Sequence, residues 1–204
     1  MQPMIIIHPK DKEELRQWFV ENVAREKEVY VHCIRKKVLP CGEDLGEAPI
    51  PYLDVVEEAL CFGWIDSVCK PLEGEEGYLQ RLSPRRKNSP WTELNKERCR
   101  RLIRLGRMTK AGRMVLPSLA QNSFKPEQWI IDAIKSDKEA WKHHRAFPKL
   151  YVRVRLYNIQ WYWNNSSMPD AKSRALKMLD KYIQAAHDGK MIGEWNDGGR
   201  LTEA

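Results

Sequence analysis

The chain has 204 residues and a formal net charge of +7, and 42% of its residues are hydrophobic while 31% are charged. This length suits one sizeable domain, and no apolar run approaches the roughly 20 residues that a membrane-spanning helix requires. The apolar run from Met4 to Ile7 is too short for a secretion signal, so we expect a cytoplasmic protein without membrane insertion.

The first predicted helix begins at Asp11, which forms a capping-box variant with Glu14, and apolar residues follow at helical spacing as far as Val23. The run 28–38 alternates and is rich in β-branched side chains, which predicts a strand. Three prolines and two glycines in residues 40–51 predict a loop after this strand.

A second helix is predicted from Pro51, a residue that suits the first helical turn, to Gly63, which favours a C-cap. The β-rich run 64–68 and the alternating run 77–82 flank the turn-rich residues 71–76, and this pattern predicts a hairpin. Together with the preceding strand, the hairpin predicts a small antiparallel sheet of about three strands.

The pattern is helical from Ser89 onward. Ser89 suits the N-cap of a basic helix, Pro90 its first position and Gly106 its end. Further helices are predicted to begin at Thr109, Pro126, Pro148 and Pro169. The helix over 148–163 is apolar on most of its circumference, which indicates burial. We therefore predict an α+β fold, a predominantly helical single domain over residues 1–192, with a frayed tail at 193–204.

The cysteines and histidines form no recognisable metal or disulfide pattern. The five cysteines are far apart and include no C-x-x-C pair, which favours reduced and mostly buried thiols; they are Cys33, Cys41, Cys61, Cys69 and Cys99. His143 and His144 are adjacent and diverge on a helix. The common nucleotide-binding and hydrolase motifs are also missing, so no metal, cofactor or catalytic residue is predicted.

The positive charge is concentrated in one segment. Residues 81–113 contain twelve Lys or Arg and two acids, so this segment carries +10 and the rest of the chain −3. Charges gathered within a Debye length of about 8–10 Å add their potentials, so the segment predicts an anionic partner.

The most specific part of this segment leads into the predicted helix start, where free N–H groups and the helix dipole favour anions. Guanidinium forks placed there can hold phosphate or carboxylate with two hydrogen bonds. The predicted anion-binding residues are Arg81, Arg85, Arg86, Lys87 and Ser89. The alternative interpretation is a solvated basic turn, partly paired with acids of residues 73–76.

Trp64 and Asp66 share one face of an extended segment, and with Trp91 they are predicted to wall the site and orient its arginines. The structural alternative is that Trp64 fills the core while Asp66 accepts hydrogen bonds at the corner. An enzymatic alternative uses Asp66 with a carboxylate of Glu57 or Glu58, or with the thiol of Cys61 or Cys69. A further alternative is nucleic-acid binding by the basic helix 90–105.

Several motifs have the order and spacing of a known family. They are Glu58-Ala59-Leu60-Cys61-Phe62-Gly63-Trp64-Ile65-Asp66, Gln80-Arg81, Ser83-Pro84-Arg85-Arg86-Lys87 with Ser89 and Trp91, Asn95-Lys96-Glu97-Arg98, and Gly106-Arg107-Met108 with Gly112. On these residues the chain resembles the YdeI or OmpD-associated family. The resemblance implies bacteriocin protection or porin association, and hence a link to defence or envelope stress, but it implies no reaction.

Asn95 and Arg107 lie within these motifs and complete the predicted site. We therefore expect a binding protein rather than an enzyme, with an anionic small molecule or an acidic protein surface as its partner. Its site is predicted at the corner formed by residues 63–66, residues 83–89 and the basic helix.

Overall fold

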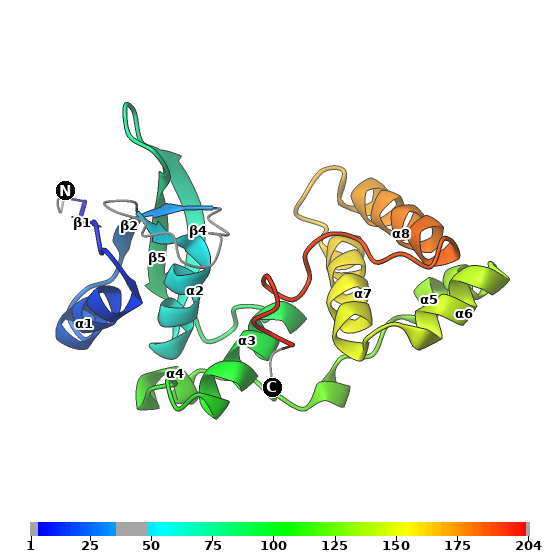
Figure 1. Ribbon diagram of the computed structural model, residues 1–204, viewed down its shortest axis with the longest axis horizontal. Helices are drawn as coiled ribbons and strands as arrows, with labels where there is room; N and C mark the ends of the chain where they lie inside the picture. Colours follow the sequence, from blue (N-terminus) through cyan, green and yellow to red (C-terminus); the bar gives the residue numbers. More distant parts are fainter. Residues whose placement is uncertain (1–3, 36–48, 203–204) are drawn as a thin grey trace. The chain divides into compact units, whose positions relative to one another are not determined.

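The computed structural model describes residues 4–35 and 49–202 (Figure 1). Some sequence predictions fall partly or wholly outside these residues: the end of the predicted strand at 36–38, most of the loop at 40–51, Cys41, and the last two residues of the predicted tail at 193–204. Within the described ranges the chain has the predicted α+β class, with eight α-helices and five strands.

The helices are α1 (Lys12–Asn22), α2 (Tyr52–Cys61), α3 (Glu93–Arg104), α4 (Lys110–Met114), α5 (Gln128–Lys135), α6 (Lys138–Ala146), α7 (Lys149–Asn164) and α8 (Ala171–His187), with a 3-10 turn η1 (Gln121–Ser123). The strands are β1 (Ile6–Ile7), β2 (Val29–Ile34), β3 (Ile50–Pro51), β4 (Trp64–Pro71) and β5 (Tyr78–Pro84). The chain forms two compact units, the first made of Met1–Pro90 with Arg98–Pro117 and the second of Trp91–Glu97 with Ser118–Ala204.

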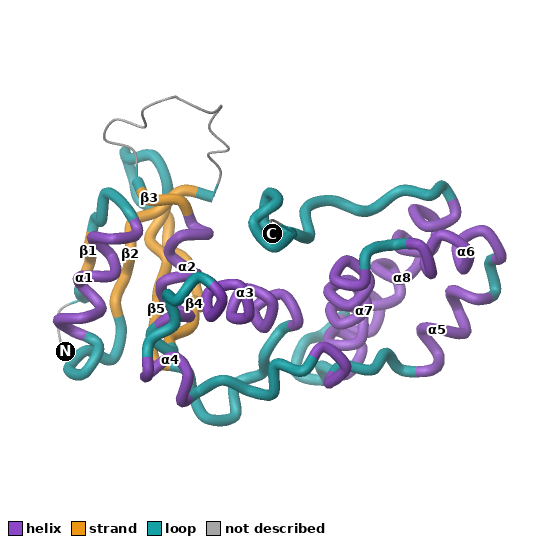
Figure 2. Tube along the Cα trace, turned by 60° about the horizontal axis from the view of Figure 1, so that its bottom comes forward, coloured by secondary structure: helices purple, strands orange, loops and turns teal. Residues whose placement is uncertain are grey.

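The sheet belongs to the first unit and has the order β1-β2-β5-β4, with β3 also paired to β2 (Figure 2). β5 pairs antiparallel with both β2 and β4, so the predicted hairpin is confirmed. The prediction of about three antiparallel strands is wrong, because β1 and β3 add two parallel pairings to β2. These strands have two residues each, too few for an alternating pattern to indicate them.

Helix α1 begins as the sequence predicts. The carboxylate of Asp11 accepts hydrogen bonds from the backbone N–H groups of Glu13 and Glu14, at 2.8 and 2.9 Å, and so caps the free donors of the first turn. Phe19 is fully buried on the inner face of α1, where it stacks on Phe62 at a ring-centroid distance of 4.9 Å. The cap therefore sets where the helix starts, and the aromatic stack sets which face it buries.

Helix α2 ends at Cys61 with Phe62 as its C-cap, one residue before the predicted Gly63, and α4 packs against this end. Gly63 has a φ of +76°, a left-handed conformation that glycine adopts without steric cost. The Thr109 hydroxyl caps α4 by accepting from the N–H of Gly112, and it donates to the carbonyl oxygen of Cys61 at 2.6 Å. Because a Cβ on Gly112 would overlap that same carbonyl, only glycine permits the close approach of α4 to α2.

A buried carboxylate joins three segments of the first unit. Glu58 on α2 is 1% exposed, and its two oxygens accept from different arginines: Arg16 of α1 at 2.8 Å and Arg107, which follows α3, at 2.6 Å. Arg107 also pairs with Glu13 at 2.9 Å. Partial burial by itself lowers the pKa of Arg107. The hydrogen bonds to the carboxylates of Glu13 and Glu58 outweigh this effect and raise the pKa above its usual range. The guanidinium groups thus offset the cost of burying the charge of Glu58.

Helix α3 begins at Glu93, so the predicted N-cap at Ser89 is wrong. The segment before it forms a turn over residues 86–89 instead of a helix, and Arg85 holds this segment: its backbone N–H donates to the carbonyl of Gly63 and its side chain donates to the carbonyl of Pro90. Thr92 caps the helix instead, with its hydroxyl accepting from the N–H of Asn95 at 3.1 Å. Both Ser89 and Thr92 have side chains that suit a cap, and the tertiary contacts of Arg85 choose between them.

The second unit is a bundle of helices in which α8 packs on both α6 and α7, and α5 packs on α6 (Figure 2). Its core is confirmed to include the predicted helix over 148–163, which the structure places at Lys149–Asn164. The buried core residues are Ile130, Ile134, Ala140, Tyr151, Leu156, Ile159, Ala175, Leu179, Tyr182 and Ala186. Beyond α8, Trp195 packs edge-on against Tyr151, and the Ile192 N–H donates to the Tyr151 hydroxyl at 3.0 Å.

No helix within residues 4–35 and 49–202 is both long enough and apolar enough to cross a membrane.

Removing both arginines that hold Glu58 should destabilise the first unit strongly. The double variant Arg16→Ala/Arg107→Ala leaves a buried carboxylate without these partners, which typically costs about 3–5 kcal/mol. As a matched control, Arg81→Ala/Lys142→Ala removes two cations from more exposed ion pairs, at less than about 1 kcal/mol per pair. Urea unfolding at neutral pH measures both losses, and equal losses would contradict the role of Glu58.

Candidate functional site

Trp64, predicted as a wall of the site, lies in the core of the first unit. Its side chain is 2% exposed and packs edge-on against Phe19 and Trp18, at centroid distances of 5.4 and 6.2 Å. The structural alternative stated for Trp64 is therefore confirmed. Asp66, two residues further along β4, is half-buried and accepts a hydrogen bond from the Tyr52 hydroxyl at 2.7 Å. Burial and the neighbouring Asp66 charge raise the pKa of Tyr52 above its usual range.

Two of the predicted arginines are held by acids of the same unit. Arg81 donates to Glu28 through Nε and Nη2, at 2.8 and 2.6 Å, and its Nη1 contacts the Ser67 hydroxyl at 3.2 Å. Arg107 is held by Glu58 and Glu13 as described above. An external anion would have to displace these carboxylates to bind either guanidinium with two hydrogen bonds.

The segment from Arg85 to Ser89 contains both buried and exposed cations. Arg85 is 7% exposed and donates to the Pro90 carbonyl at 2.9 Å, and burial lowers its pKa from the ordinary arginine value. Arg86 and Lys87 are exposed, and the Ser89 N–H closes a turn on the Arg86 carbonyl at 3.0 Å. Arg86 and Lys87 are thus the exposed cations among the ten residues predicted for the site.

The two remaining predicted residues, Trp91 and Asn95, belong to the second unit, where both are half-buried. Asn95 lies in the first turn of α3, and its backbone N–H is used by the Thr92 cap. The first turn of α3 already contains the buried acid Glu93, which pairs with Lys96 at 2.7 Å and with Arg153 at 3.0 Å. This helix start is therefore occupied by a carboxylate of the chain itself.

The carboxylates invoked by the enzymatic alternative have structural partners, and of its two thiols Cys61 is buried while Cys69 is exposed. Glu57 pairs with Arg101 at 2.9 Å, and Glu58 with two arginines, while Asp66 accepts from Tyr52. Burial, followed by the Glu58 charge, raises the pKa of Cys61 to about 12, so its thiol stays protonated and weakly nucleophilic at neutral pH. Burial likewise raises the pKa of Cys33 to about 11 and of Cys99 to about 12.

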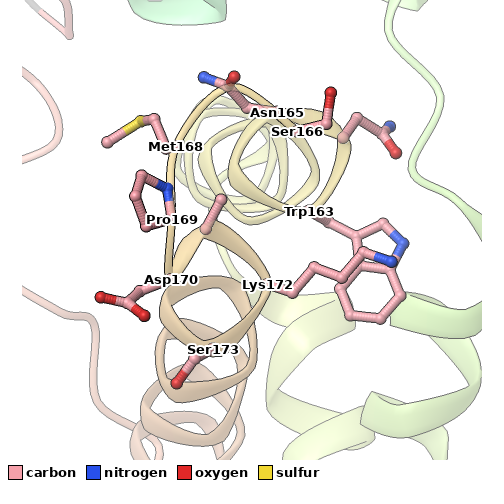
Figure 3. A pocket seen from close by; sticks show the side chains of 10 residues that line it. Trp163, Asn165, Ser166, Met168, Pro169, Asp170, Lys172 and Ser173 are labelled. Atoms are coloured by element: carbon pink, nitrogen blue, oxygen red, sulfur yellow. The ribbon is translucent and has the colours of Figure 1, made fainter.

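Two of the clefts that the described residues form lie within the second unit. The larger of these two, of about 590 Å³, lies at the turn between α7 and α8, over residues 163–166 and 168–173 (Figure 3). Lys172 extends across the Trp163 ring at 5.1 Å, and Asp170 lies at the start of α8 on the same cleft. Its charged lining therefore includes both signs, and its cation is already held over an aromatic ring.

The smaller cleft, of about 420 Å³, lies between η1 with the residues after it, the end of α6 and the start of α7. We call it the α6–α7 cleft. Its lining residues are Gln121, Asn122, Phe124, Pro126, His144, Arg145, Phe147, Lys149, Val152 and Arg153. These described lining residues include three permanent cations and no acid, together with two phenylalanine rings.

Lys149 and Arg153 lie one turn apart on α7, which places their side chains on the same face of the helix. Arg145 comes from the last turn of α6 and is exposed, as is Lys149. Arg153 is buried and is held from behind by Glu93 and Glu97, the latter at 2.6 Å. The lining therefore combines two exposed cations with a buried one whose charge is balanced, and the guanidinium of Arg145 lies over the Trp141 ring at 5.8 Å.

His144 forms a neutral part of this lining. It is buried, its ring stacks on Trp141 at 5.1 Å, and its Nδ1 lies 2.9 Å from the Tyr182 hydroxyl. Burial lowers the pKa of His144 below its ordinary value, which favours the neutral ring. Sequence reasoning missed this cleft because it interpreted residues 148–163 only as buried helix. The spacing of Lys149 and Arg153, just after Arg145, was the available signal.

The fold and the site define an α+β protein with a small mixed sheet, a helical second unit and a basic cleft of ligand size. The chain belongs to the family of the domain of unknown function DUF8412, whose model matches residues 7–115. The match covers most of the first unit and ends before η1, so the α6–α7 cleft lies outside it. No curated protein and no solved structure matches the chain. The resemblance to the YdeI or OmpD-associated family stays a prediction.

The buried neutral ring of His144 should make the protein sensitive to mild acid. In the unfolded chain a histidine takes up a proton as the pH falls below about 6.5, whereas the folded state resists this uptake. The free energy of unfolding should therefore fall between pH 7.5 and pH 5.5, and His144→Gln should fall less over the same range. Urea unfolding at several pH values measures the two slopes, and identical slopes would contradict burial of a neutral ring.

Proposed function

We propose that this protein binds an anionic small molecule, and that the α6–α7 cleft is its binding site. The observation that carries the proposal is the lining of the cleft, in which the described residues include the exposed cations Arg145 and Lys149 and no acid. Arg153 also lines the cleft, but its charge is balanced by Glu93 and Glu97. A concave site with convergent charges of one sign attracts a ligand of the opposite sign, and its walls reduce the screening by solvent.

The start of α7 strengthens the attraction. Pro148 occupies the N-cap and has no capping side chain, and the first turn of this 16-residue helix contains no acidic residue. The positive end of the helix dipole and the first backbone N–H groups thus lack compensation from the chain's own side chains there. Lys149 and Val152 line the cleft from these first turns, so this helix end adjoins the ligand space.

The apolar part of the lining indicates which anions fit best. Phe124 and Phe147 contribute half-buried rings, and Asn122 and Gln121 add amide groups that both donate and accept hydrogen bonds. The volume of about 420 Å³ lies in the usual range for small-molecule sites. We therefore propose a ligand that joins a phosphate or carboxylate to a flat apolar group, such as a nucleotide or an aromatic acid.

The corner predicted from the sequence remains a second location for the same class of ligand. Its support is the exposure of Arg86 and Lys87, but Arg81 and Arg107 are held by acids. Nucleic-acid binding by the basic helix also stays a prediction, although Arg101 pairs with Glu57 and so offers less to a phosphate backbone. Bacteriocin protection, implied by the family resemblance, would then be a consequence of ligand or acidic-partner binding.

Ligand binding should raise the melting temperature of the full chain. Nucleoside phosphates, sugar phosphates and aromatic carboxylates are screened by differential scanning fluorimetry at low salt. A ligand at about a hundredfold above its Kd stabilises by roughly 2.7 kcal/mol, which corresponds to roughly 5–10 °C for a chain of this size.

Two double variants, each lacking two exposed cations, locate the site. Arg145→Ala/Lys149→Ala should weaken binding by about tenfold or more per lost charge-assisted hydrogen bond. Arg86→Ala/Lys87→Ala should leave it unchanged. The reverse result would place the site at the corner, and the absence of any ligand-dependent shift in the wild type would refute the proposed class of function.

A further inference from the structure

Three residues of the first unit, none of which lines the α6–α7 cleft, have side chains that can bind a metal ion. They are His8 just after β1, His32 in β2 and Glu75 in the turn between β4 and β5. One ligand atom from each residue lies within 4.8 Å of the other two. The three residues come from separate segments, so no local spacing in the sequence indicates this group.

The sheet register brings the two histidines together. β1 pairs parallel with β2, with Ile6 beside Tyr30 and Ile7 beside Val31, and one further step places His8 beside His32. Residues paired in this way point to the same face of a sheet. The Nδ1 atoms of the two rings are 3.1 Å apart, and the Nδ1 of His32 is 3.8 Å from a carboxylate oxygen of Glu75.

A hydrogen bond to the backbone determines which nitrogen of His32 has a lone pair available for a metal ion. The side chain of His32 is 9% exposed, and its Nε2 lies 2.7 Å from the carbonyl oxygen of Glu76. A carbonyl oxygen only accepts, so Nε2 must be the N–H donor, and in the neutral ring the lone pair is then on Nδ1. Orientation of a histidine by a backbone carbonyl through its second nitrogen is typical of metal ligands.

The turn between β4 and β5 is shaped to lie over this ring. Gly77 has a φ of +102°, and a Cβ at this position would come within 3.2 Å of the Nε2 of His32 and 2.6 Å of the Cys33 carbonyl. A side chain here would push the turn off β2 and remove the Glu76 carbonyl from the ring. The glycine therefore permits the contact that aims the Nδ1 of His32 at His8 and Glu75.

We propose that His8, His32 and Glu75 bind a Zn²⁺ ion. Two imidazole nitrogens favour a borderline first-row metal over Mg²⁺ or Ca²⁺, and His₂Glu is a ligand set that zinc uses with a fourth position left open. In tetrahedral geometry, with bonds of about 2.0–2.1 Å, ligand atoms lie about 3.3 Å apart. The observed 3.1 and 3.8 Å are close to this value, and the exposed Glu75 has room to approach.

A bound ion would join the first strand and the β4–β5 turn through β2. The site is independent of the proposed anion cleft, because its ligands all belong to the first unit. Without a metal, the same geometry is satisfied when the His8 Nδ1–H donates to the Nδ1 of His32. A simple hydrogen-bonded histidine pair is therefore the competing explanation that the experiment must separate from metal binding.

Isothermal titration calorimetry with ZnCl₂ tests the proposal on the full chain after removal of any affinity tag. We expect one Zn²⁺ per chain, and we expect His8→Ala and Glu75→Gln each to weaken binding by at least about tenfold. Both residues are exposed, so neither change removes buried core. Glu73→Gln, which alters another exposed acid of the same turn, is the matched control and should bind as the wild type does.

Co²⁺ provides a second measurement at the same site. Its visible absorption should show tetrahedral coordination in the wild type and in Glu73→Gln, and this absorption should be lost in His8→Ala. His187→Ala controls for the exposed His187–Asp137 pair, whose atoms lie 2.9 Å apart, and should leave both signals unchanged. Failure of the wild type to bind Zn²⁺, or binding that His8→Ala and Glu75→Gln leave intact, would overturn the proposal in favour of a histidine pair.

Discussion

The buried carboxylate of Glu58 constrains the arrangement of the first unit. At 1% exposure its charge is tolerated only when it is paired, and its two oxygens recruit Arg16 and Arg107 from segments that are 91 residues apart in the chain. α1, α2 and the end of the α3 segment must therefore come together for the charge to be satisfied. The docking of α4 follows from this, because Thr109 is two residues beyond Arg107 and hydrogen-bonds to the end of α2.

Ion pairing of this kind also changes how the positive charge of the basic segment, residues 81–113, is interpreted. Twelve cations against two acids suggest a strongly positive surface. Within the fold, Arg81, Arg101 and Arg107 are matched by acids from outside the segment, and Arg85 is buried. Much of the apparent charge excess is thus internal structure. The α6–α7 cleft, which lies outside the segment, combines fewer cations with a concave apolar lining, and this combination makes it the stronger candidate for an anion site.

The two proposed sites depend on different kinds of long-range geometry. The histidine group exists because a two-residue strand pairs with β2 in one register, and a shift by one residue would turn His8 to the opposite face of the sheet. The α6–α7 cleft exists because the last turn of one helix and the first turns of the next meet beside η1. Neither arrangement has a signature in local spacing, and both leave polar groups directed at space that a ligand can fill.

The sequence by itself determined the local structure: Asp11 as a cap, the end of α2 just before Gly63, the hairpin, and the buried helix near residue 150. Capping, left-handed backbone and periodic burial depend on residues a few positions apart, so the sequence alone predicts them. Tertiary structure alone decided that Thr92 rather than Ser89 caps α3, that β1 and β3 join the sheet, and which carboxylate each arginine binds. These outcomes depend on contacts between residues that are distant in the chain. Where two local patterns have similar propensity, only such contacts decide which of the two structures forms.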